Sequence, residues 1–132
     1  MIYVDTCLVI YVFESHPRYA ARVLAAMATV PAGALAISPL VKLECLVGPM
    51  RTGNLVLQDH YEQGLQRFTV LPLPDAVFVQ AAVLRARFGL KTPDALHLAA
   101  AQHHRCEAVW TNDDRLADAG HGLALNVLAA PL

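Results

Sequence analysis

The stretch MIYVDTCLVIYVF, residues 1–13, contains the pattern on which the fold depends. Its first four residues are apolar and include β-branched side chains, and Asp5 interrupts this run. Residues 7–13 are apolar again and lead into Glu14-Ser15-His16-Pro17, a combination typical of a turn and a helix start. The stretch therefore predicts a strand and then a helix.

The same alternation continues along the rest of the chain. Further strands are predicted at residues 35–37, 68–73, 108–111 and 123–128. Helices are predicted at residues 18–29, 38–48, 51–67, 74–88, 92–104 and 114–119. Strands that alternate with helices predict an α/β fold of three layers, α/β/α, with a central parallel sheet of about five short strands. In such sheets ligands bind at the carboxyl ends of the strands, where the strand order reverses.

Local signals predict where individual helices begin and end. Ser38-Pro39 and Thr92-Pro93 each combine an N-cap residue with a proline suited to the first helical position. Gly48-Pro49 predicts the end of the helix that starts at Ser38, because glycine and proline both interrupt helices.

The composition argues against a membrane span and a disulfide scaffold. Hydrophobic residues make up 56% of the 132 residues. No apolar run reaches the roughly 18 residues of a membrane helix, and the first segment has no basic leader. Cys7, Cys45 and Cys106 are an odd number at unrelated spacings, which favours reduced, packed thiols over disulfides or a zinc site. We expect one cytoplasmic domain over residues 1–132, with its excess apolar surface buried in the sheet and at a subunit interface.

Two aspartates follow predicted strands. Asp5 ends the first strand, and Asp113 comes just after the fourth. Because parallel strands share one carboxyl edge, both side chains are expected at the same edge of the sheet. An aspartate at a strand end is often only a helix cap, so that alternative stays open. Asp114 opens the next helical turn, where its charge suits the helix dipole, although it could also hold a second ion through water.

Two further carboxylates lie on predicted helices. Glu44 has Leu40, Val41, Val47 and Gly48 as its neighbours three and four residues away, which places it on an apolar face. Such a carboxylate needs a cation, either in a functional site or in a structural ion pair with an arginine.

Asp94 begins the helix after Pro93. There its charge favours the helix dipole, but the same position faces the strand-end edge beside Asp5.

Four carboxylates from remote segments are thus expected at one edge. Like charges in a cluster are unfavourable unless a cation is present. Oxygen ligands without a nearby pair of histidines or cysteines favour Mg²⁺ or Mn²⁺ over zinc. A site of this kind activates water and stabilises an in-line phosphoryl displacement.

The motifs resemble those of the PIN-domain ribonucleases, and in particular the VapC-type toxins of bacterial toxin–antitoxin pairs. The resemblance rests on four segments in order along nearly the whole chain: Tyr3-Val4-Asp5-Thr6, Glu44-Cys45-Leu46-Val47-Gly48, Thr92-Pro93-Asp94-Ala95-Leu96-His97-Leu98-Ala99 and Thr111-Asn112-Asp113.

The resemblance implies that Asp5, Glu44, Asp94 and Asp113 are the metal-binding and catalytic acids. It further implies Mg²⁺- or Mn²⁺-dependent cleavage of RNA, a homodimer, and inhibition by a small antitoxin whose tail enters the site. Thr6 and Asn112 would be polar helpers near the metal or the scissile phosphate.

Basic residues near these motifs are candidate phosphate contacts, namely Arg51, Lys91 and Arg115. The net charge is −1, but removing the four acids and Asp114 from the 11 acidic residues leaves 6 against 10 basic residues, which allows modest attraction of phosphate. His97 is not expected to act directly, because a metal-bound water makes a separate base unnecessary.

Two other functions remain open at this stage. A phosphohydrolase that acts on small molecules through an aspartyl-phosphate is one, although Thr6-Cys7 follows Asp5 where an Asp-x-Asp pattern is expected. A non-catalytic nucleic-acid-binding module that keeps only the fold is the other.

Overall fold

Five strands pair in parallel within residues 1–31 and 33–129, the part of the chain that this computed structural model describes. The strand order is β3-β2-β1-β4-β5. The strands are β1 (Ile2–Val4), β2 (Leu35–Ile37), β3 (Thr69–Val70), β4 (Ala108–Thr111) and β5 (Ala124–Asn126). Because β1 is central, Ile2 lies opposite Leu35 of β2 on one side and Ala108 of β4 on the other.

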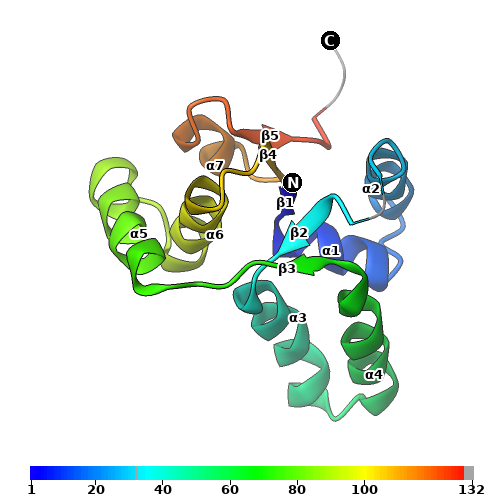
Figure 1. The fold of residues 1–132 in the computed structure, drawn as a ribbon. Helices are drawn as coiled ribbons and strands as arrows, with labels where there is room; N and C mark the ends of the chain where they lie inside the picture. The colour runs from blue at the N-terminus through cyan, green and yellow to red at the C-terminus, as the bar shows by residue number, and fades with distance from the viewer. Residues whose placement is uncertain (32, 130–132) are drawn as a thin grey trace.

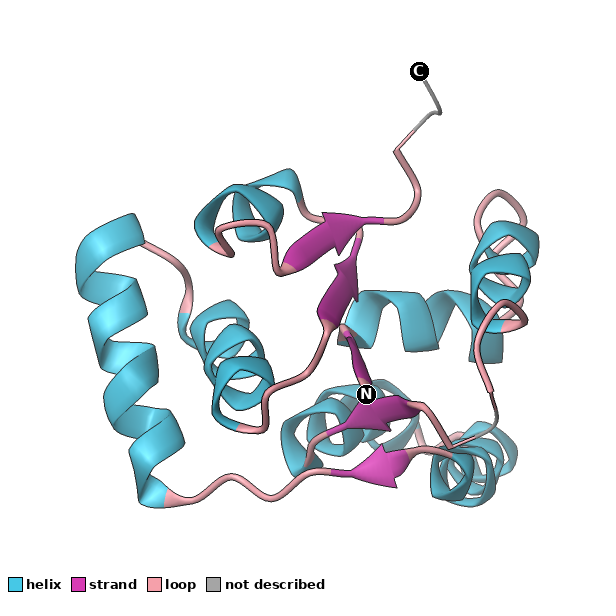
Figure 2. Cartoon of the chain, turned by 45° about the horizontal axis from the view of Figure 1, so that its top comes forward, coloured by secondary structure: helices cyan, strands magenta, loops and turns pink. Residues whose placement is uncertain are grey.

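Helices cover both faces of the sheet (Figures 1 and 2). The helices are α1 (Thr6–Phe13), α2 (Ala20–Met27), α3 (Pro39–Thr52), α4 (Leu55–Gly64), α5 (Asp75–Phe88), α6 (Thr92–His103) and α7 (Asp114–Ala119), with a 3-10 turn η1 (Leu65–Arg67). Helices α5, α6 and α7 lie on one side, and α1 and α2 lie on the other. Helices α3 and α4 pack against each other and against α1. The predicted three-layer α/β/α fold with a central parallel sheet is confirmed.

Burial on both faces explains the high apolar content. Helix α6 packs against β1 and β4 on its inner side and against α5 on its outer side. Its residues from Ala95 to Ala101 are all buried, and the alanines among them let the helix lie close to the sheet. Cys45 and Cys106 are buried free thiols and Cys7 is half-buried, as the spacing predicts. None of the helices in the described residues is long and apolar enough to cross a membrane.

The prediction that a helix ends at Gly48-Pro49 is wrong. Helix α3 continues through Pro49 to Thr52 and ends at Gly53, which has a left-handed φ of 68°. A proline inside a helix removes one backbone hydrogen bond, but Pro49 is buried, so packing of its ring offsets part of that loss. The next helix starts only at Leu55, where the Asn54 side chain accepts a hydrogen bond from the Leu57 backbone.

Other element ends also differ from the prediction. Strand β3 contains only Thr69 and Val70, because it lies at the sheet edge and the prolines at 72 and 74 cannot donate to a neighbouring strand. Thr92 is the first residue of α6, so the cap position falls on Lys91. Ser38 does occupy the cap position of α3, but its hydroxyl does not cap the helix.

Candidate active site

A cleft of about 670 Å³ lies at the carboxyl ends of β1 and β4. The chain passes from β1 to β2 and β3 on one side of the sheet and then crosses to β4 and β5 on the other, so this is the point where the strand order reverses. All four predicted acids line the cleft. They come from the end of β1, from α3, from the first turn of α6 and from the loop after β4, and are Asp5, Glu44, Asp94 and Asp113.

Asp5 is held between β1 and β4. Its backbone N–H donates to the Trp110 carbonyl over 2.9 Å, which continues the pairing of the two strands. The residue is 7% exposed, and its Oδ2 accepts a hydrogen bond of 2.7 Å from the Thr111 hydroxyl. Although Asp5 occupies the cap position of α1, its side chain makes no capping hydrogen bond. The helix-cap alternative therefore does not account for this carboxylate.

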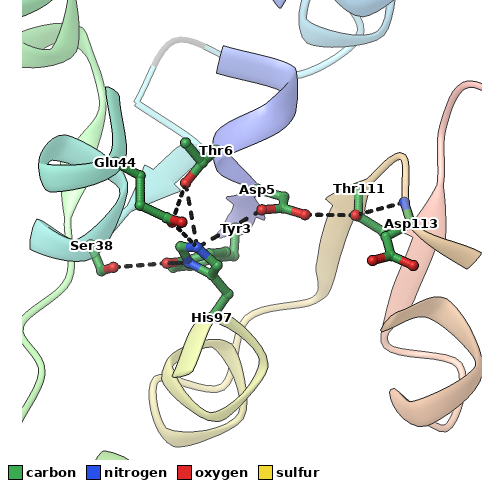
Figure 3. Close-up of polar contacts among 8 residues, drawn as sticks. All are labelled: Tyr3, Asp5, Thr6, Ser38, Glu44, His97, Thr111 and Asp113. Carbon is green, nitrogen blue, oxygen red and sulfur yellow. Dashed lines mark hydrogen bonds and ion pairs between the residues drawn. The ribbon is translucent and has the colours of Figure 1, made fainter. Parts of the chain in front are cut away.

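Thr111 connects Asp5 to Asp113 (Figure 3). The buried Thr111 hydroxyl donates to Asp5 and accepts a 3.0 Å hydrogen bond from the Asp113 backbone N–H. Asp113 also caps α7, because its Oδ1 accepts from the Arg115 backbone N–H over 2.9 Å. The Arg115 side chain is 3.7 Å from the same oxygen but largely exposed, so that ion pair contributes little.

Glu44 is paired with a histidine. Its Oε1 accepts hydrogen bonds of 2.8 Å from the Thr6 hydroxyl and 2.6 Å from His97 Nε2. Burial alone would raise the pKa of Glu44, but the hydrogen bond and charge of His97, with the hydrogen bond from Thr6, outweigh burial and lower that pKa. Among the described residues, the side chain paired with Glu44 is that of His97, so the alternative of a structural ion pair with an arginine is wrong.

Three buried polar side chains lie behind Glu44 (Figure 3). His97 is 1% exposed, and its Nδ1 is 2.6 Å from the Tyr3 hydroxyl, which is itself 2.8 Å from the Ser38 hydroxyl. His97 Nε2 also lies 3.3 Å from the Thr6 hydroxyl and 3.9 Å from Asp5 Oδ1.

The sequence pattern did not reveal these three side chains, because it assigns Ser38 a capping role, assigns His97 no direct role and gives no role to the Tyr3 hydroxyl. One available signal was that His97 lies one turn after Asp94 among buried apolar neighbours, where a polar side chain needs a partner.

The carboxylates repel one another. Burial raises the pKa of Asp94, and the charges of Asp5, Asp113 and Glu44 raise it further, against a smaller opposing effect of His97. Cys7 also lines the cleft, but burial and the Asp5 charge raise its pKa to about 12, so it remains a neutral thiol. The charged donors of the cleft are therefore carboxylate oxygens, which a hard divalent cation prefers.

The scaffold leaves oxygens free on each acid. Within the described residues, no hydrogen bond is made by Asp5 Oδ1, Glu44 Oε2, Asp113 Oδ2 or either oxygen of Asp94. In the same part of the chain, no group of three or more His, Cys, Asp or Glu side chains is already arranged around a common ion position. The donor chemistry and the excess negative charge fit a divalent cation.

The other predicted residues divide into those at the cleft and one that is remote. Asn112 lines the cleft and donates to the Tyr11 hydroxyl over 3.2 Å. Arg115 lines it too, and with Lys91 and Asp94 it also lines a neighbouring cavity of about 260 Å³. Arg51, near the end of α3, does not line the cleft.

Asp114 also reaches the cleft, but it is exposed and accepts a 2.8 Å hydrogen bond from Asn126 of β5. Asp113 and Asp114 thus have different partners. Asp113 is hydrogen-bonded to Thr111 and to the first turn of α7, whereas Asp114 is hydrogen-bonded to Asn126 of the edge strand β5.

Comparison with known proteins identifies the family. The chain matches the PIN domain over residues 2–122. It shares its fold with a toxin–antitoxin complex from Klebsiella pneumoniae, at 24% identity over 96% of this chain and 98% of that chain, with a TM-score of 0.80. FitAcB from Neisseria gonorrhoeae is similar at 22% identity over 98% and 100% of the two chains, with a TM-score of 0.82.

A third similar structure is that of VapBC2 from Rickettsia felis, bound to a DNA fragment from the VapBC2 promoter. It is 19% identical over 95% of this chain and 98% of that chain, with a TM-score of 0.75. No curated protein matches the chain in sequence. Because the PIN-domain match spans residues 2–122 and the fold likeness covers nearly the whole chain, this protein belongs to the PIN-domain family.

Proposed function

We propose that this protein is a metal-dependent endoribonuclease, a VapC-like toxin that cuts phosphodiester bonds of RNA in the cytoplasm. The observation that carries the proposal is the meeting of Asp5, Glu44, Asp94 and Asp113 in one cleft where the strand order reverses. Carboxylates that are close together repel one another, and a cation among them offsets this repulsion. The similar structures from Klebsiella, Neisseria and Rickettsia support the assignment to a toxin–antitoxin pair.

The four carboxylates would hold Mg²⁺ or Mn²⁺. When bound, such an ion lowers the pKa of water and neutralises charge that develops on the phosphate. The protein's own residues orient the carboxylates: Thr111 holds Asp5, while Thr6 and His97 hold Glu44. The cationic side chains of Lys91 and Arg115, beside Asp94, would attract the phosphates that flank the scissile bond.

The partners proposed are an antitoxin and a second copy of the chain. An antitoxin tail that enters the cleft would exclude RNA from the carboxylates. Dimer formation is supported by apolar side chains on the surface, such as Leu55 and Val56 of α4 at 74% and 83% exposure and Val79 of α5 at 59%. Light scattering should give twice the monomer mass for the isolated protein.

Substitution of Asp5 by asparagine tests the proposed function. Asp5→Asn removes one negative oxygen donor but keeps the size of the side chain and its hydrogen bond to Thr111, so the protein should fold. RNA cleavage with Mn²⁺ should fall by roughly 100-fold or more, and growth inhibition should disappear. Sequencing of RNA ends after brief induction measures cleavage in cells. Asp59→Asn, on the exposed surface of α4, is the matched control.

Three results would argue against the proposal. Retained cleavage by Asp5→Asn excludes the acidic cleft as the active site. Hydrolysis of small phosphate esters with a trapped phosphoaspartate, in place of RNA cleavage, favours the phosphohydrolase. Absence of both Mn²⁺ binding and cleavage in the wild-type protein favours a non-catalytic nucleic-acid-binding module.

A further inference from the structure

Three polar side chains are buried together in the centre of the molecule. Tyr3 of β1, Ser38 at the end of β2 and His97 of α6 are exposed by 0%, 1% and 1%. Burying polar groups in an apolar core is unfavourable unless each one is hydrogen-bonded. These side chains therefore need an explanation that packing alone does not provide.

The three side chains form a chain of hydrogen bonds that ends on Glu44 (Figure 3). Ser38 is bonded to the Tyr3 hydroxyl, Tyr3 to His97 Nδ1, and His97 Nε2 to Glu44 Oε1. An ionised carboxylate can only accept, so Nε2 carries the proton and donates to Glu44. At the other ring nitrogen, His97 Nδ1 shares a hydrogen bond with the Tyr3 hydroxyl, which is in turn hydrogen-bonded to Ser38. Among the described residues, no buried side-chain nitrogen or oxygen lacks a hydrogen-bond partner, so this network is fully satisfied.

Ser38 does not make the capping hydrogen bond that its position favours, and takes part in this hydrogen-bond network instead. Ser38 occupies the N-cap position of α3, where a serine hydroxyl normally accepts a hydrogen bond from the first turn of the helix. Here it makes no such bond and contacts Tyr3 instead. Burial raises the pKa of Tyr3, the hydrogen bond with Ser38 partly opposes this, and the charges of Asp5 and Glu44 add smaller increases, so the phenol stays protonated.

We propose that Ser38, Tyr3 and His97 are positioning residues that hold the Glu44 carboxylate in the orientation needed to bind a divalent cation. This inference rests on the proposed function. The network fixes Oε1 of Glu44, and within the described residues Oε2 has no hydrogen bond and is left for the ion. It also ties α3 to α6, which carry two of the four acids, Glu44 and Asp94. Loss of a hydrogen bond that orients a metal ligand in this way typically weakens metal affinity by roughly 10- to 100-fold.

Calorimetry with Mn²⁺ alone, without RNA, tests this role. His97→Leu deletes both imidazole hydrogen bonds and should weaken Mn²⁺ binding roughly 10- to 100-fold. His97→Gln keeps an N–H donor near Glu44 and should recover part of that affinity. Tyr3→Phe deletes only a hydroxyl one bond further away and should weaken binding by roughly 2- to 10-fold. It also provides a second variant if His97→Leu does not fold.

A double-mutant cycle separates positioning from general loss of stability. If His97 acts through Glu44, His97→Leu should change Mn²⁺ affinity less than about twofold when combined with Glu44→Gln. Two matched controls should leave the affinity unchanged. His103→Gln alters an exposed histidine of the same helix, and Tyr61→Phe removes a buried hydroxyl whose partner is Glu14.

The possible failures can be told apart. If wild type binds Mn²⁺ and cuts RNA, but His97→Leu weakens binding equally with and without Glu44→Gln, the positioning role is overturned and the nuclease stands. Unchanged Mn²⁺ affinity in folded His97→Leu and Tyr3→Phe overturns it too. If wild type binds no Mn²⁺, both the proposed function and the positioning role fail.

Discussion

Asp113 and Asp114 are adjacent in the chain but have different surroundings. Asp113 receives a backbone hydrogen bond from Arg115 and is linked through Thr111 to Asp5. Asp114 is exposed and accepts from Asn126. Because an ion shared with Asp5 requires a side chain that the scaffold holds beside Asp5, Asp113 is the better candidate.

Separate substitutions of these two residues should give different results. Asp113→Asn should reduce RNA cleavage by roughly 100-fold or more, because it removes a charged oxygen donor from the cleft. Asp114→Asn should retain most of the activity, because its carboxylate bonds to Asn126 at the edge of the sheet. Cleavage rates with Mn²⁺, measured for purified single variants, check this. The opposite ranking would show that Asp114 is the metal-binding acid.

Thr111 should matter for both stability and activity. Thr111→Val keeps the shape of the side chain but removes the hydroxyl that donates to Asp5 and accepts from the Asp113 N–H. The loss should lower the free energy of unfolding by about 1–3 kcal/mol, because the buried Asp5 carboxylate and the half-buried Asp113 N–H each lose a hydrogen bond. Urea denaturation measures this effect, and cleavage should fall roughly 10- to 100-fold. Thr111→Ser retains a hydroxyl and should stay close to wild type; a Ser variant as weak as Val would contradict the explanation.

At the scale of single residues, the acids were more predictable than the residues that hold them. Asp5 and Asp113 could be placed because strand ends in a parallel sheet share one edge. The contact of Tyr3 with His97 could not be predicted, because it joins residues 94 positions apart and depends on how α6 packs against β1. The prediction for Ser38 fails for a different reason. Its position favours capping of α3, but its hydroxyl is hydrogen-bonded to Tyr3 instead.

At the scale of elements, α3 shows where local sequence signals fail. Gly48 and Pro49 are both helix-interrupting residues, yet the helix passes through them and ends at Gly53. The helix carries Glu44 less than two turns before Pro49, so its continuation supports the segment that presents this carboxylate. A rule based on neighbours in sequence cannot include the burial of the Pro49 ring, which becomes known only with the tertiary structure.

Two glycine substitutions in α3 test this boundary. Gly48 lies inside the helix, and a Cβ built there meets nothing within 4 Å, so Gly48→Ala should stabilise the protein by about 0.5–1 kcal/mol. Gly53 has an equally open environment but a left-handed φ of 68°, so Gly53→Ala should destabilise it by about 1–2 kcal/mol. Thermal or urea unfolding gives both values. If Gly48→Ala were the destabilising change, the helix would end where the sequence pattern suggests.

At the scale of the whole molecule, the strand order produces the cleft. The alternation of strands and helices predicts a parallel sheet, but not that β1 lies between β2 and β4. That arrangement pairs β1 with β4 and places Asp5 beside Thr111 at the edge where the cleft lies. The strand order depends on how all the helices pack together, so it cannot be predicted from any single segment of the sequence.

The clustered acids are expected to lower the stability of the metal-free fold. The raised pKa of Asp94, caused first by burial and then by Asp5 and Asp113, means that its ionised form is disfavoured in the fold. Because the fold disfavours this charge, the Asp94 carboxylate lowers stability as it ionises with rising pH. Asp94→Asn removes this charge and should raise the melting temperature of the metal-free protein by a few degrees.

The same substitution should remove the stabilising effect of metal. For wild type, Mn²⁺ at 100 times its dissociation constant should add about 2.7 kcal/mol to the free energy of unfolding, and EDTA should reverse the gain. Asp94→Asn should show little or no gain at that concentration.

Asp75→Asn is the matched control, because Asp75 lies in the first turn of α5, is exposed and does not line the cleft. It should lose about 0.3–1 kcal/mol of favourable helix-dipole interaction and keep the full response to Mn²⁺. Melting curves of the three proteins with EDTA and with Mn²⁺ measure both effects. A lower melting temperature for Asp94→Asn in EDTA would show that the favourable helix-dipole interaction, and not repulsion among the acids, dominates at this position.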